Sequence, residues 1–538
     1  MVLTGVIPAL LFFAAPSLGT KIVNGLFDDT FNGIYQLSPF DWALLIPYFG
    51  ILVILSIYGL HRYETMRLYL KHRKKLLTEP ATRFATLPRV TIQLPLYNER
   101  FVVARLLEEV CKIDYPRHLL QIQVLDDSTD ETHPYTERLS NELRAVGHPV
   151  EYHHRANRRG YKAGALQEGL ATATGEFIAI FDADFLPPPE FLMRTIHFFA
   201  DPEVGVVQTR WSYVNKEYNL LTQVEAMLLD GHFVLEHGAR CGRGLFFNFN
   251  GTAGVIRKTM IDDAGGWQHD TLTEDTDLSY RAQLKGWRFV YLIGLDCPSE
   301  LPVETYGFQV QQSRWAKGLT QVAKKLLPSI FKANLPWRVK LEAFLHLTPN
   351  ISYPLMIVVS ALMMPVMIIR FYMGWFQMLL IDFPLILASF FSISAFYLLA
   401  QKELFPKTWR RSIVFLPMLL ASGVALTVSN TKAVMEALFG IRTGFARTPK
   451  YAIGTGEAKT APNSRPYMRR SGLLPYIEIA IGTYFVLMVA WAIDSYNFLS
   501  VPFLLLFVCG YYWAGFTTLY QEFRDRLAWQ RERRVARA

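Results

Sequence analysis

Acidic residues follow two apolar runs that have the composition of buried strands. Asp182 and Asp184 come directly after Phe177–Phe181, and Asp127 comes after Ile122–Leu125. Two carboxylates one residue apart at a strand end can hold a hard divalent cation, which also takes water and phosphate oxygens. Such a cation stabilises the charge that develops on a departing diphosphate. We interpret Asp182 and Asp184 as ligands of Mg²⁺ or Mn²⁺; the competing interpretation is a solvated loop or a helix cap.

Groups that suit a nucleotide occur near these carboxylates in the expected fold. Tyr97 and Glu99 lie in a turn after the first strand, and together with Asp127 they can hydrogen-bond a nucleobase or ribose. Lys162 stands where a helix is expected to begin, a position at which backbone amides and a lysine bind phosphate. The ordinary alternatives are that Asp127 or Ser128 caps the next helix and that Lys162 is a surface lysine.

A helix expected over Glu274–Leu284 carries the candidate base. It opens with Glu274 and Asp275, directly after Thr273. Asp275 can accept the proton of an acceptor hydroxyl as that hydroxyl attacks an anomeric carbon, with Glu274 beside it. A single displacement with one base would invert the anomeric centre. Early carboxylates also favour a helix N-terminus, so the alternative is that Thr273 is a plain N-cap.

The stretch Gln311–Trp315, which we expect to begin another helix, adds two further groups. Arg314 can pair with a diphosphate, and the indole of Trp315 offers a flat face to a sugar ring. A core tryptophan beside a surface arginine is the alternative.

Short β-rich runs alternate with helical patterns from Val90 onward. The expected strands are Val90–Leu94, Ile122–Leu125, Val150–His154, Phe177–Phe181 and Gly205–Gln208, with helices from about Phe101, Glu131, Ala163 and Pro189. This alternation predicts an α/β domain with a mainly parallel sheet and right-handed crossovers. Ligands of such sheets bind at the carboxyl ends of the strands, where the acidic residues fall.

The chain as a whole is too apolar to be entirely soluble. Hydrophobic residues make up 51% and charged residues 19% of it, whereas soluble domains carry about 25% charge. The net charge of +9 is concentrated beside the apolar runs, which is typical of the cytoplasmic flanks of membrane helices and argues against a nucleic-acid partner. The cysteines Cys111, Cys241, Cys297 and Cys509 lack the spacing of a zinc site or a disulfide framework, and we interpret them as reduced, mostly buried thiols.

Apolar runs long enough to cross a bilayer predict the topology. They lie at Trp42–Leu60 and at about residues 348–369, 377–400, 473–493 and 498–518. The run 412–429 lies between two basic segments, so we expect it to lie in the interface or to re-enter. Arg370 is expected to snorkel, and residues 1–19 form either a further span or an interfacial segment. This arrangement leaves the soluble domain and the basic tail in the cytoplasm.

Over about Pro88–Lys325 these motifs together resemble glycosyltransferase family 2, in the branch that contains the cellulose synthases. The matching residues are Asp127, Lys162, Asp182-x-Asp184, Thr273-Glu274-Asp275 and Gln311-x-x-Arg314-Trp315, in the family's order. Longer strings, among them Gln123–Asp130, Gly160–Leu166 and Phe249–Gly254, are similar to the cellulose-synthase-like A and C proteins, the mannan and xyloglucan-backbone synthases.

The resemblance implies a Rossmann-like glycosyltransferase-A domain and a role for each motif. Asp127 and Glu99 would hold the nucleoside, Lys162 and Arg314 the diphosphate, Asp182 and Asp184 the metal, and Asp275 would be the base. Trp315 would stack on the terminal acceptor sugar, and Gln311, Phe247 and Asn250 would belong to the acceptor site, although Asn248 stands where the related plant enzymes have a small residue. Phe445–Lys450 is similar, apart from Arg447, to a gating loop in which Thr448 and Lys450 would close over the diphosphate.

These observations predict the following organisation of the chain. It has a membrane segment at 1–61 with a span at about 41–61, a basic linker at 62–82, the catalytic domain at 83–333, interfacial helices and two spans at 334–430, a cytoplasmic gating-like loop at 431–472, two spans at 473–520 and a basic tail at 521–538. The expected function is inverting, metal-dependent transfer of a hexose from UDP-glucose or GDP-mannose, with a slight preference for UDP-glucose, to a β-linked polysaccharide exported across the plasma or inner membrane. The alternative is addition of one sugar to a membrane lipid.

Overall fold

The computed structural model describes residues 35–77, 79–373, 384–385, 387–441, 444, 448, 450–453 and 472–535. The strands are β1 (Val90–Leu96), β2 (Leu120–Asp126), β3 (Val150–His154), β4 (Phe177–Ile180), β5 (Val204–Tyr213), β6 (Gly254–Arg257) and β7 (Arg288–Ser299). The helices around the sheet are α3 (Val103–Cys111), α4 (Thr132–Ala145), α5 (Tyr161–Thr172), α6 (Phe191–Thr195), α7 (Leu220–Asp230), the π-helix η4 (Gly231–His237), α8 (Gly238–Arg243), α9 (Lys258–Asp263) and α10 (Glu274–Leu284). The remaining helices are α2 (Pro39–His72), α11 (Thr305–Lys332), α12 (Trp337–Leu347), α13 (Ser352–Met373), α15 (Ser392–Leu404), α16 (Leu416–Ala425), α17 (Thr427–Leu438), α18 (Leu474–Asp494) and α19 (Val501–Val535).

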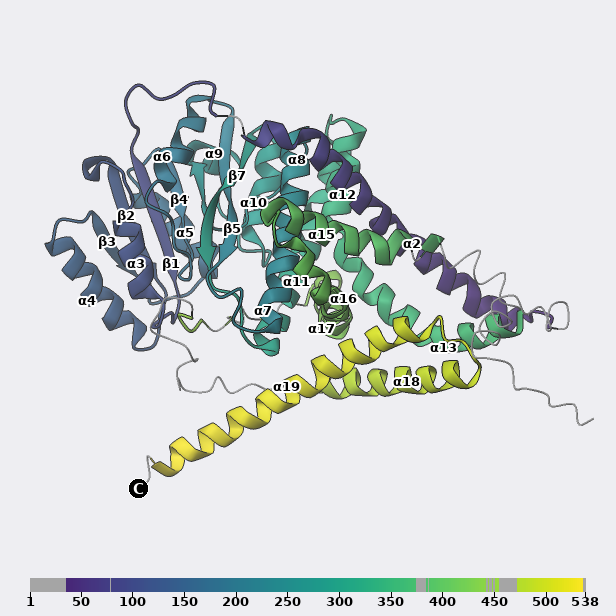
Figure 1. The fold of residues 1–538 in the computed structure, drawn as a ribbon. Coiled ribbons are helices and arrows are strands. Elements are labelled where there is room, and N and C mark those ends of the chain that lie inside the picture. Colours follow the sequence, from purple (N-terminus) through teal and green to yellow (C-terminus); the bar gives the residue numbers. More distant parts are fainter. Residues whose placement is uncertain are drawn as a thin grey trace, which may run out of the picture.

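The strands form one mixed sheet in the order β3-β2-β1-β4-β6-β5-β7 (Figure 1). Every neighbouring pair is parallel except those of β6, which runs antiparallel to β4 and β5. This confirms the predicted α/β fold with a mainly parallel sheet. The prediction lacked β6 and β7. β6 is only four residues long, and along β7 buried residues alternate with partly exposed ones, so neither has a strong strand signal in the sequence.

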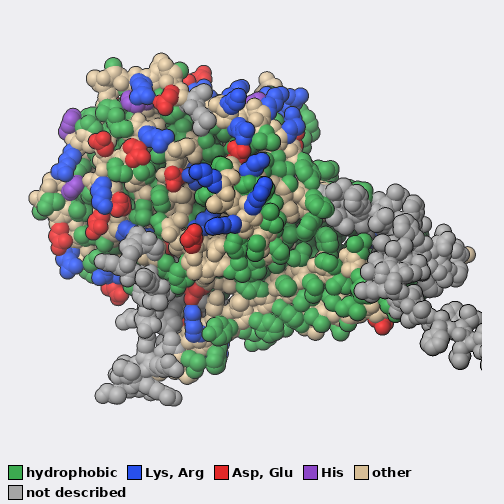
Figure 2. Space-filling model, viewed as in Figure 1, with side chains coloured by type: hydrophobic (Ala, Val, Ile, Leu, Met, Phe, Trp, Pro, Cys, Tyr) green, Lys and Arg blue, Asp and Glu red, His purple; other side chains and the backbone are tan. Residues whose placement is uncertain are grey.

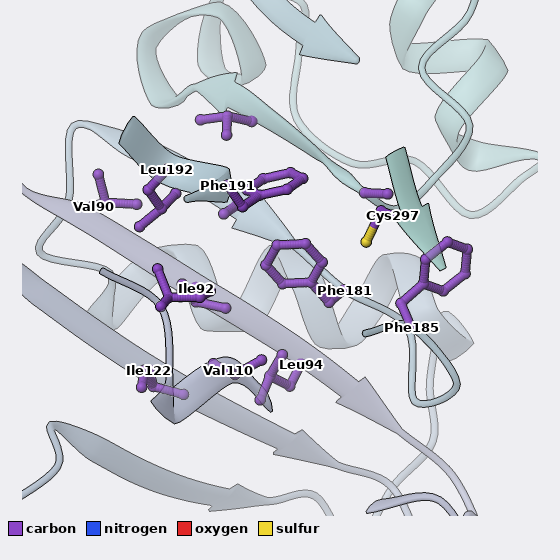
Figure 3. Packing of buried hydrophobic residues seen from close by; sticks show 14 of the residues in the cluster. Val90, Ile92, Leu94, Val110, Ile122, Phe181, Phe185, Phe191, Leu192 and Cys297 are labelled. Carbon is purple, nitrogen blue, oxygen red and sulfur yellow. The ribbon is translucent and has the colours of Figure 1, made fainter. Parts of the chain in front are cut away.

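Both faces of the sheet are covered by helices, which explains why its central strands are buried along most of their length. Val90, Ile92 and Leu94 of β1 point to the face on which α3 packs, and Figure 3 shows Leu94 beside Val110 of that helix. Alternate residues of β4 point to opposite faces, because the side-chain period of a strand is two. Phe177 therefore joins this cluster, whereas its neighbour Ile178 packs with the residues of α5.

The starts of the helices correct two of the predictions. α11 begins at Thr305, so Gln311–Trp315 lies inside this helix and not at its start. α4 begins at Thr132 after an N-cap at Glu131, so neither Asp127 nor Ser128 caps it. The predicted start of α10 at Glu274 is confirmed, and Thr273 occupies its N-cap position without donating or accepting a capping hydrogen bond.

Within the described residues, four helices are long and apolar enough to cross a membrane: Pro39–Leu76, Pro349–Met373, Leu474–Asp494 and Val501–Leu527. They match four of the predicted runs.

The surface agrees with a division into an α/β domain and a membrane region. Charged side chains gather over the sheet, and hydrophobic side chains cover much of the region below it (Figure 2). Arg370 does not snorkel, because its side chain is buried with the guanidinium over the ring of Phe49.

The two other predicted membrane runs have a different form. The helices Trp409–Ala425 and Thr427–Leu438 pass the same test only together and are bent by 40°, a geometry consistent with the re-entrant alternative for 412–429. Of the run 377–400, the described part comprises residues 384–385, the short π-helix η6 (Leu387–Phe391) and α15, and none of these is a complete span. Residues 1–19 lie outside the described residues.

The helix α11 is anchored at its start by the C-terminal helix pair α18 and α19, which lie side by side (Figure 1). Gln309 donates a hydrogen bond to Glu478 of α18 at 3.4 Å and accepts one from Thr518 of α19 at 3.2 Å. Arg524 of α19 also pairs with Glu304, the residue before the helix. The helix that carries Arg314 and Trp315 is thus tied directly to membrane helices.

Candidate active site

Each of the two aspartates at the end of β4 meets a lysine from a distant part of the chain. Asp182 Oδ1 accepts a hydrogen bond from Lys162 Nζ at 2.5 Å, and this lysine also donates to the carbonyl oxygen of Gly251 at 2.9 Å. Asp184 Oδ2 accepts from Lys450 Nζ at 2.7 Å. Lys162 comes from the first turn of α5, which begins after Gly160 in the left-handed conformation. Burial alone would lower the pKa of Lys162. The neighbouring carboxylates of Asp182 and Glu274 outweigh this effect and raise the pKa above its ordinary value, so the lysine stays charged.

Asp275 reaches the same place from the first turn of α10. A Cβ atom added to Gly251 would lie 2.9 Å from Asp275 Oδ2 and 3.3 Å from Lys162 Nζ, so the carboxylate and the ammonium group meet over this glycine. Gly251 has a φ of +79°, which also disfavours any other residue. Burial and the neighbouring carboxylate of Glu274 raise the pKa of Asp275 to about 7.

Arg314 lies close enough to four acidic residues of the site for their charges to act on it. Burial lowers the pKa of its guanidinium, and Glu274, Asp182, Asp275 and Asp184 oppose that effect in this order. Burial also raises the pKa of Glu274, against the influence of Lys162. The residues predicted for metal, diphosphate and base therefore converge at the carboxyl end of β4, although they come from four separate segments.

The residues predicted for the nucleoside lie farther along the same sheet edge. Asp127 is buried and receives two hydrogen bonds from the guanidinium of Arg155, at 2.7 Å and 2.6 Å. The guanidinium of Arg158 stacks on Tyr97 at 3.2 Å from the ring centre. Glu99 is near enough to Lys450 to stabilise its charge. The prediction missed both arginines, because a basic residue in a loop has no sequence signal that separates this role from solvation.

Two described residues of the gating-like loop lie against the site. Thr448 is buried, and Lys450 donates to the carbonyl oxygen of Glu300 at 2.7 Å in addition to its contact with Asp184. The amide of Tyr451 donates to Glu300 Oε1 at 2.7 Å. The other residues of the motif, 445–447 and 449, lie outside the described residues.

A cavity of about 1040 Å³ begins at Asp275, Asn250 and Trp315 and continues between the membrane helices. Its first part is polar and includes Gln312, and its farther part is lined by residues of α2, α13, α16 and α19 such as Leu52, Met363, Gly423 and Phe507. Two residues predicted for the acceptor site are placed elsewhere. Phe247 is 1% exposed and packs in the core behind the cavity, and Gln311 is not among its lining residues.

The pair Asp182 and Asp184 fits a divalent cation that completes its coordination with water and phosphate. Among the described residues there is no group of three or more His, Cys, Asp or Glu side chains that could hold a metal by itself. Mg²⁺ and Mn²⁺ do not require such a group beside phosphates, since Mg²⁺ keeps several waters and takes one or two carboxylates. Lys162 and Lys450 contact these carboxylates, so the two aspartates already balance positive charge at this point.

Comparison with known proteins defines the class. Residues 177–426 match the family model described as glycosyl transferase family group 2. The chain is 43% identical over 259 residues to glucomannan 4-beta-mannosyltransferase 1 of Oryza sativa subsp. japonica, an alignment that covers 47% of this chain and 50% of the relative. It is also 43% identical over 250 residues to glucomannan 4-beta-mannosyltransferase 2 of Arabidopsis thaliana, covering 46% and 47%.

The match of residues 177–426 to the family group 2 model confirms the resemblance drawn from the motifs. The chain spans about half the length of the curated relatives it matches. A solved mannosyltransferase from Pyrobaculum calidifontis, in complex with GDP-Man and Mn²⁺, aligns with a TM-score of 0.49 at 21% identity, covering 73% of this chain and 99% of that one.

Proposed function

We propose that this protein is an inverting, metal-dependent glycosyltransferase that extends a β-linked polysaccharide and passes it through the membrane. The observation that carries the proposal is the continuous cavity, which joins Asp275 and Trp315 to the interior of the membrane helices. A polymer that grows at Asp275 would enter this cavity directly. The basic residues that flank the apolar runs support a cytoplasmic position for the catalytic domain.

The chemistry follows from the converging residues. Asp275 takes the proton of the acceptor hydroxyl, and the oxygen attacks the anomeric carbon of the donor sugar from the face opposite the leaving diphosphate, which inverts that carbon. Lys162 and Arg314 supply positive charge for the diphosphate. A divalent cation, held by Asp182 and Asp184, supplies further stabilisation of the leaving group's charge when bound.

We propose mannose as the transferred sugar and GDP-mannose as the donor. The support is the similarity of the catalytic domain to two plant proteins named glucomannan 4-beta-mannosyltransferases. This choice replaces the slight preference for UDP-glucose drawn from the sequence, and UDP-glucose remains the competing donor.

The test is a donor screen on the purified full chain in detergent, with labelled GDP-mannose and UDP-glucose and either Mg²⁺ or Mn²⁺. We expect an insoluble labelled polymer from GDP-mannose that an endo-β-mannanase degrades. The apolar lining of the farther cavity also suits a lipid acceptor. If the label were extracted into organic solvent as a lipid that carries a single sugar, the reaction would be glycolipid synthesis and not polysaccharide synthesis. If neither donor gave a labelled product, both polysaccharide synthesis and glycolipid synthesis would be rejected.

Lys450 gives a separate test of the gating idea and of the metal site. Lys450 donates a hydrogen bond to Asp184, a proposed metal ligand. We therefore expect Lys450→Ala to free this carboxylate and tighten Mn²⁺ binding in the absence of donor, and to slow transfer. Titration followed by Mn²⁺ paramagnetic resonance measures the first effect, and labelled product the second. Unchanged transfer in the Thr448→Ala, Lys450→Ala double variant would contradict a role of the loop in the reaction.

A further inference from the structure

A chain of charged side chains that none of the motifs contains lines the first part of the cavity. His232 Nδ1 lies 2.9 Å from Glu236 Oε2, and Arg240 donates to the same oxygen at 3.2 Å. Arg240 Nε also donates to Glu342 Oε1 at 3.0 Å, and the other oxygen of Glu342 lies 2.8 Å from His61 Nε2. These five residues, which we call the His232 network, join η4 and α8 to α12 and to the membrane helix α2.

Four members of the network, His61, His232, Glu236 and Arg240, line the cavity, and Glu342 does not. The side chains of His232 and Glu236 are 30% and 34% exposed, whereas Arg240 is 4% and Glu342 10% exposed. His232 and Glu236 line the cavity together with Asp275 and Trp315, so their exposed surface faces its interior. Burial raises the pKa of Glu236, but Arg240 and His232 lower it well below its ordinary value, which keeps a carboxylate at this wall.

The network is connected to the catalytic end of the cavity through the same π-helix. His237, the last residue of η4, lies with its Nε2 3.1 Å from the carbonyl oxygen of Asn248 and 3.0 Å from Asn250 Nδ2. Asn250 is one residue before the glycine over which Asp275 and Lys162 meet. π-helical turns occur frequently at functional sites, and this one carries His232 and Glu236 in the wall of the cavity that Asn250 also lines.

The chemistry of this wall fits a neutral sugar better than an ion. Both carboxylates of the network already have Arg240 and an imidazole as neighbours, so neither is a bare charge to which an ion would bind. A carboxylate held in place accepts hydrogen bonds from two hydroxyls, and an imidazole beside it can donate or accept a third. The indoles of Trp315 and Trp211 line the same part of the cavity and offer flat faces for sugar rings.

We propose that His232 and Glu236 form an acceptor subsite that binds the hydroxyls of a hexose unit behind the terminal acceptor sugar. The inference rests on the proposed function, since it names where the growing chain is held while Asp275 acts on its end. Arg240, Glu342 and His61 are positioning residues that hold the two side chains in place. The subsite would keep the acceptor in register between additions.

The test uses the purified full chain, GDP-mannose and β-1,4-mannotriose as the added acceptor. We expect His232→Ala and Glu236→Gln each to raise the KM for mannotriose by about 10- to 100-fold, because a hydrogen bond to a charged group contributes about 1.5–3 kcal/mol. The KM for GDP-mannose should stay within about twofold, since the donor site lies on the other side of Asp275. His153→Ala is the matched control, because it removes another histidine paired with a glutamate, Glu151 at 3.4 Å on β3, away from the cavity.

Two outcomes would overturn the subsite. An unchanged KM for mannotriose in both variants would show that the wall does not bind the acceptor. An equal rise in the KM for donor and acceptor, without recovery in His232→Gln, would show a structural role only. Calorimetric binding of mannotriose to wild type and to each variant tests the subsite even if no donor supports polymer synthesis, so failure of the subsite and failure of the proposed function remain distinguishable.

Discussion

At the scale of single residues, the site gathers acidic side chains that would repel one another without the cations between them. Lys162 contacts Asp182 and approaches Asp275 across Gly251. Arg314 lies in the field of the same carboxylates. Such clustering of opposite charges in a buried place shifts pKa values and is a mark of functional sites. The geometry therefore joins the residues proposed for the metal, the diphosphate and the base into one electrostatic unit.

Asp275→Asn removes the base and keeps the shape of the side chain. We expect kcat for transfer to fall by at least about 10³-fold, within the range that a general base supplies. Nucleotide binding should change little, because Lys162 and Arg314 remain. Labelled transfer and calorimetric binding of GDP measure the two effects on the same preparation. Residual turnover within about tenfold of wild type would remove the base assignment.

The pKa of Asp275, raised to about 7 by burial and by Glu274, predicts the pH dependence of transfer. The deprotonated form is the base, so kcat/KM should rise with pH, by about tenfold between pH 6 and pH 8 for a group that titrates at 7. Glu274→Gln removes the neighbouring negative charge and should move this rise to lower pH, whatever its effect on the maximum. A rise that stays at the same pH in this variant would show that another group controls it.

At the scale of elements, α10 and α11 meet at the turn that presents the base. A Cβ atom on Gly318 of α11 would lie 2.5 Å from Thr273 Cγ2 and 2.9 Å from the backbone nitrogen of Thr273. These distances are shorter than packed atoms tolerate, so the start of α10 can stay in place only if position 318 has no side chain. The spacing of the two helices therefore fixes where Asp275 lies.

Gly318→Ala should displace the start of α10 and lower kcat by at least about tenfold, since small misplacements of a reacting group are costly. We expect the thermal midpoint to fall as well, because the clash includes backbone. Gly307→Ala is the control within the same helix, since its new Cβ would make only ordinary contacts at 3.6 Å. Equal activity of both variants would show that the helix spacing does not position the base.

The elements that could be predicted from sequence are those rich in aliphatic and β-branched residues, those with long apolar runs, and those with marked ends. β1 to β5, the start of α10 and four membrane helices belong to this group. The sequence singled out Asp182, Lys162, Asp275 and Arg314 by their motifs, and the structure brings these four residues together. Arg155 and His232 were missed, because neither a basic loop residue nor a lone histidine has a sequence signal that separates a site role from solvation or packing. Phe247 was misassigned because an apolar residue near a motif can face either the core or a cavity.

At the scale of the whole molecule, the cavity gives the catalytic domain and the membrane helices a common interior. Gly423 of α16 lines its farther part, and a Cβ atom there would meet nothing within 4 Å. A large side chain at this position can therefore enter the cavity without disturbing the fold. This makes it possible to test the cavity as the path of the product.

Gly423→Trp should stop accumulation of long polymer while release of GDP from the donor continues, because the active site itself is untouched. Product size on gels and nucleotide release measure these two effects. Gly50→Trp is the matched control, since Gly50 of α2 also has open space around a new Cβ atom and does not line the cavity. Polymer of normal length from Gly423→Trp would show that the product leaves by another path.

The attachment of α11 to α18 and α19 limits how the protein can be recombined with its relatives. The helix carries Arg314 and Trp315 in its middle and is fastened at its start by Gln309 and Glu304. A chimera that exchanged only the α/β domain would join a foreign α11 to the original C-terminal pair, and its polar contacts would be mismatched. The smallest exchangeable module is therefore discontinuous: the domain, α11 and the last two helices must be transplanted together.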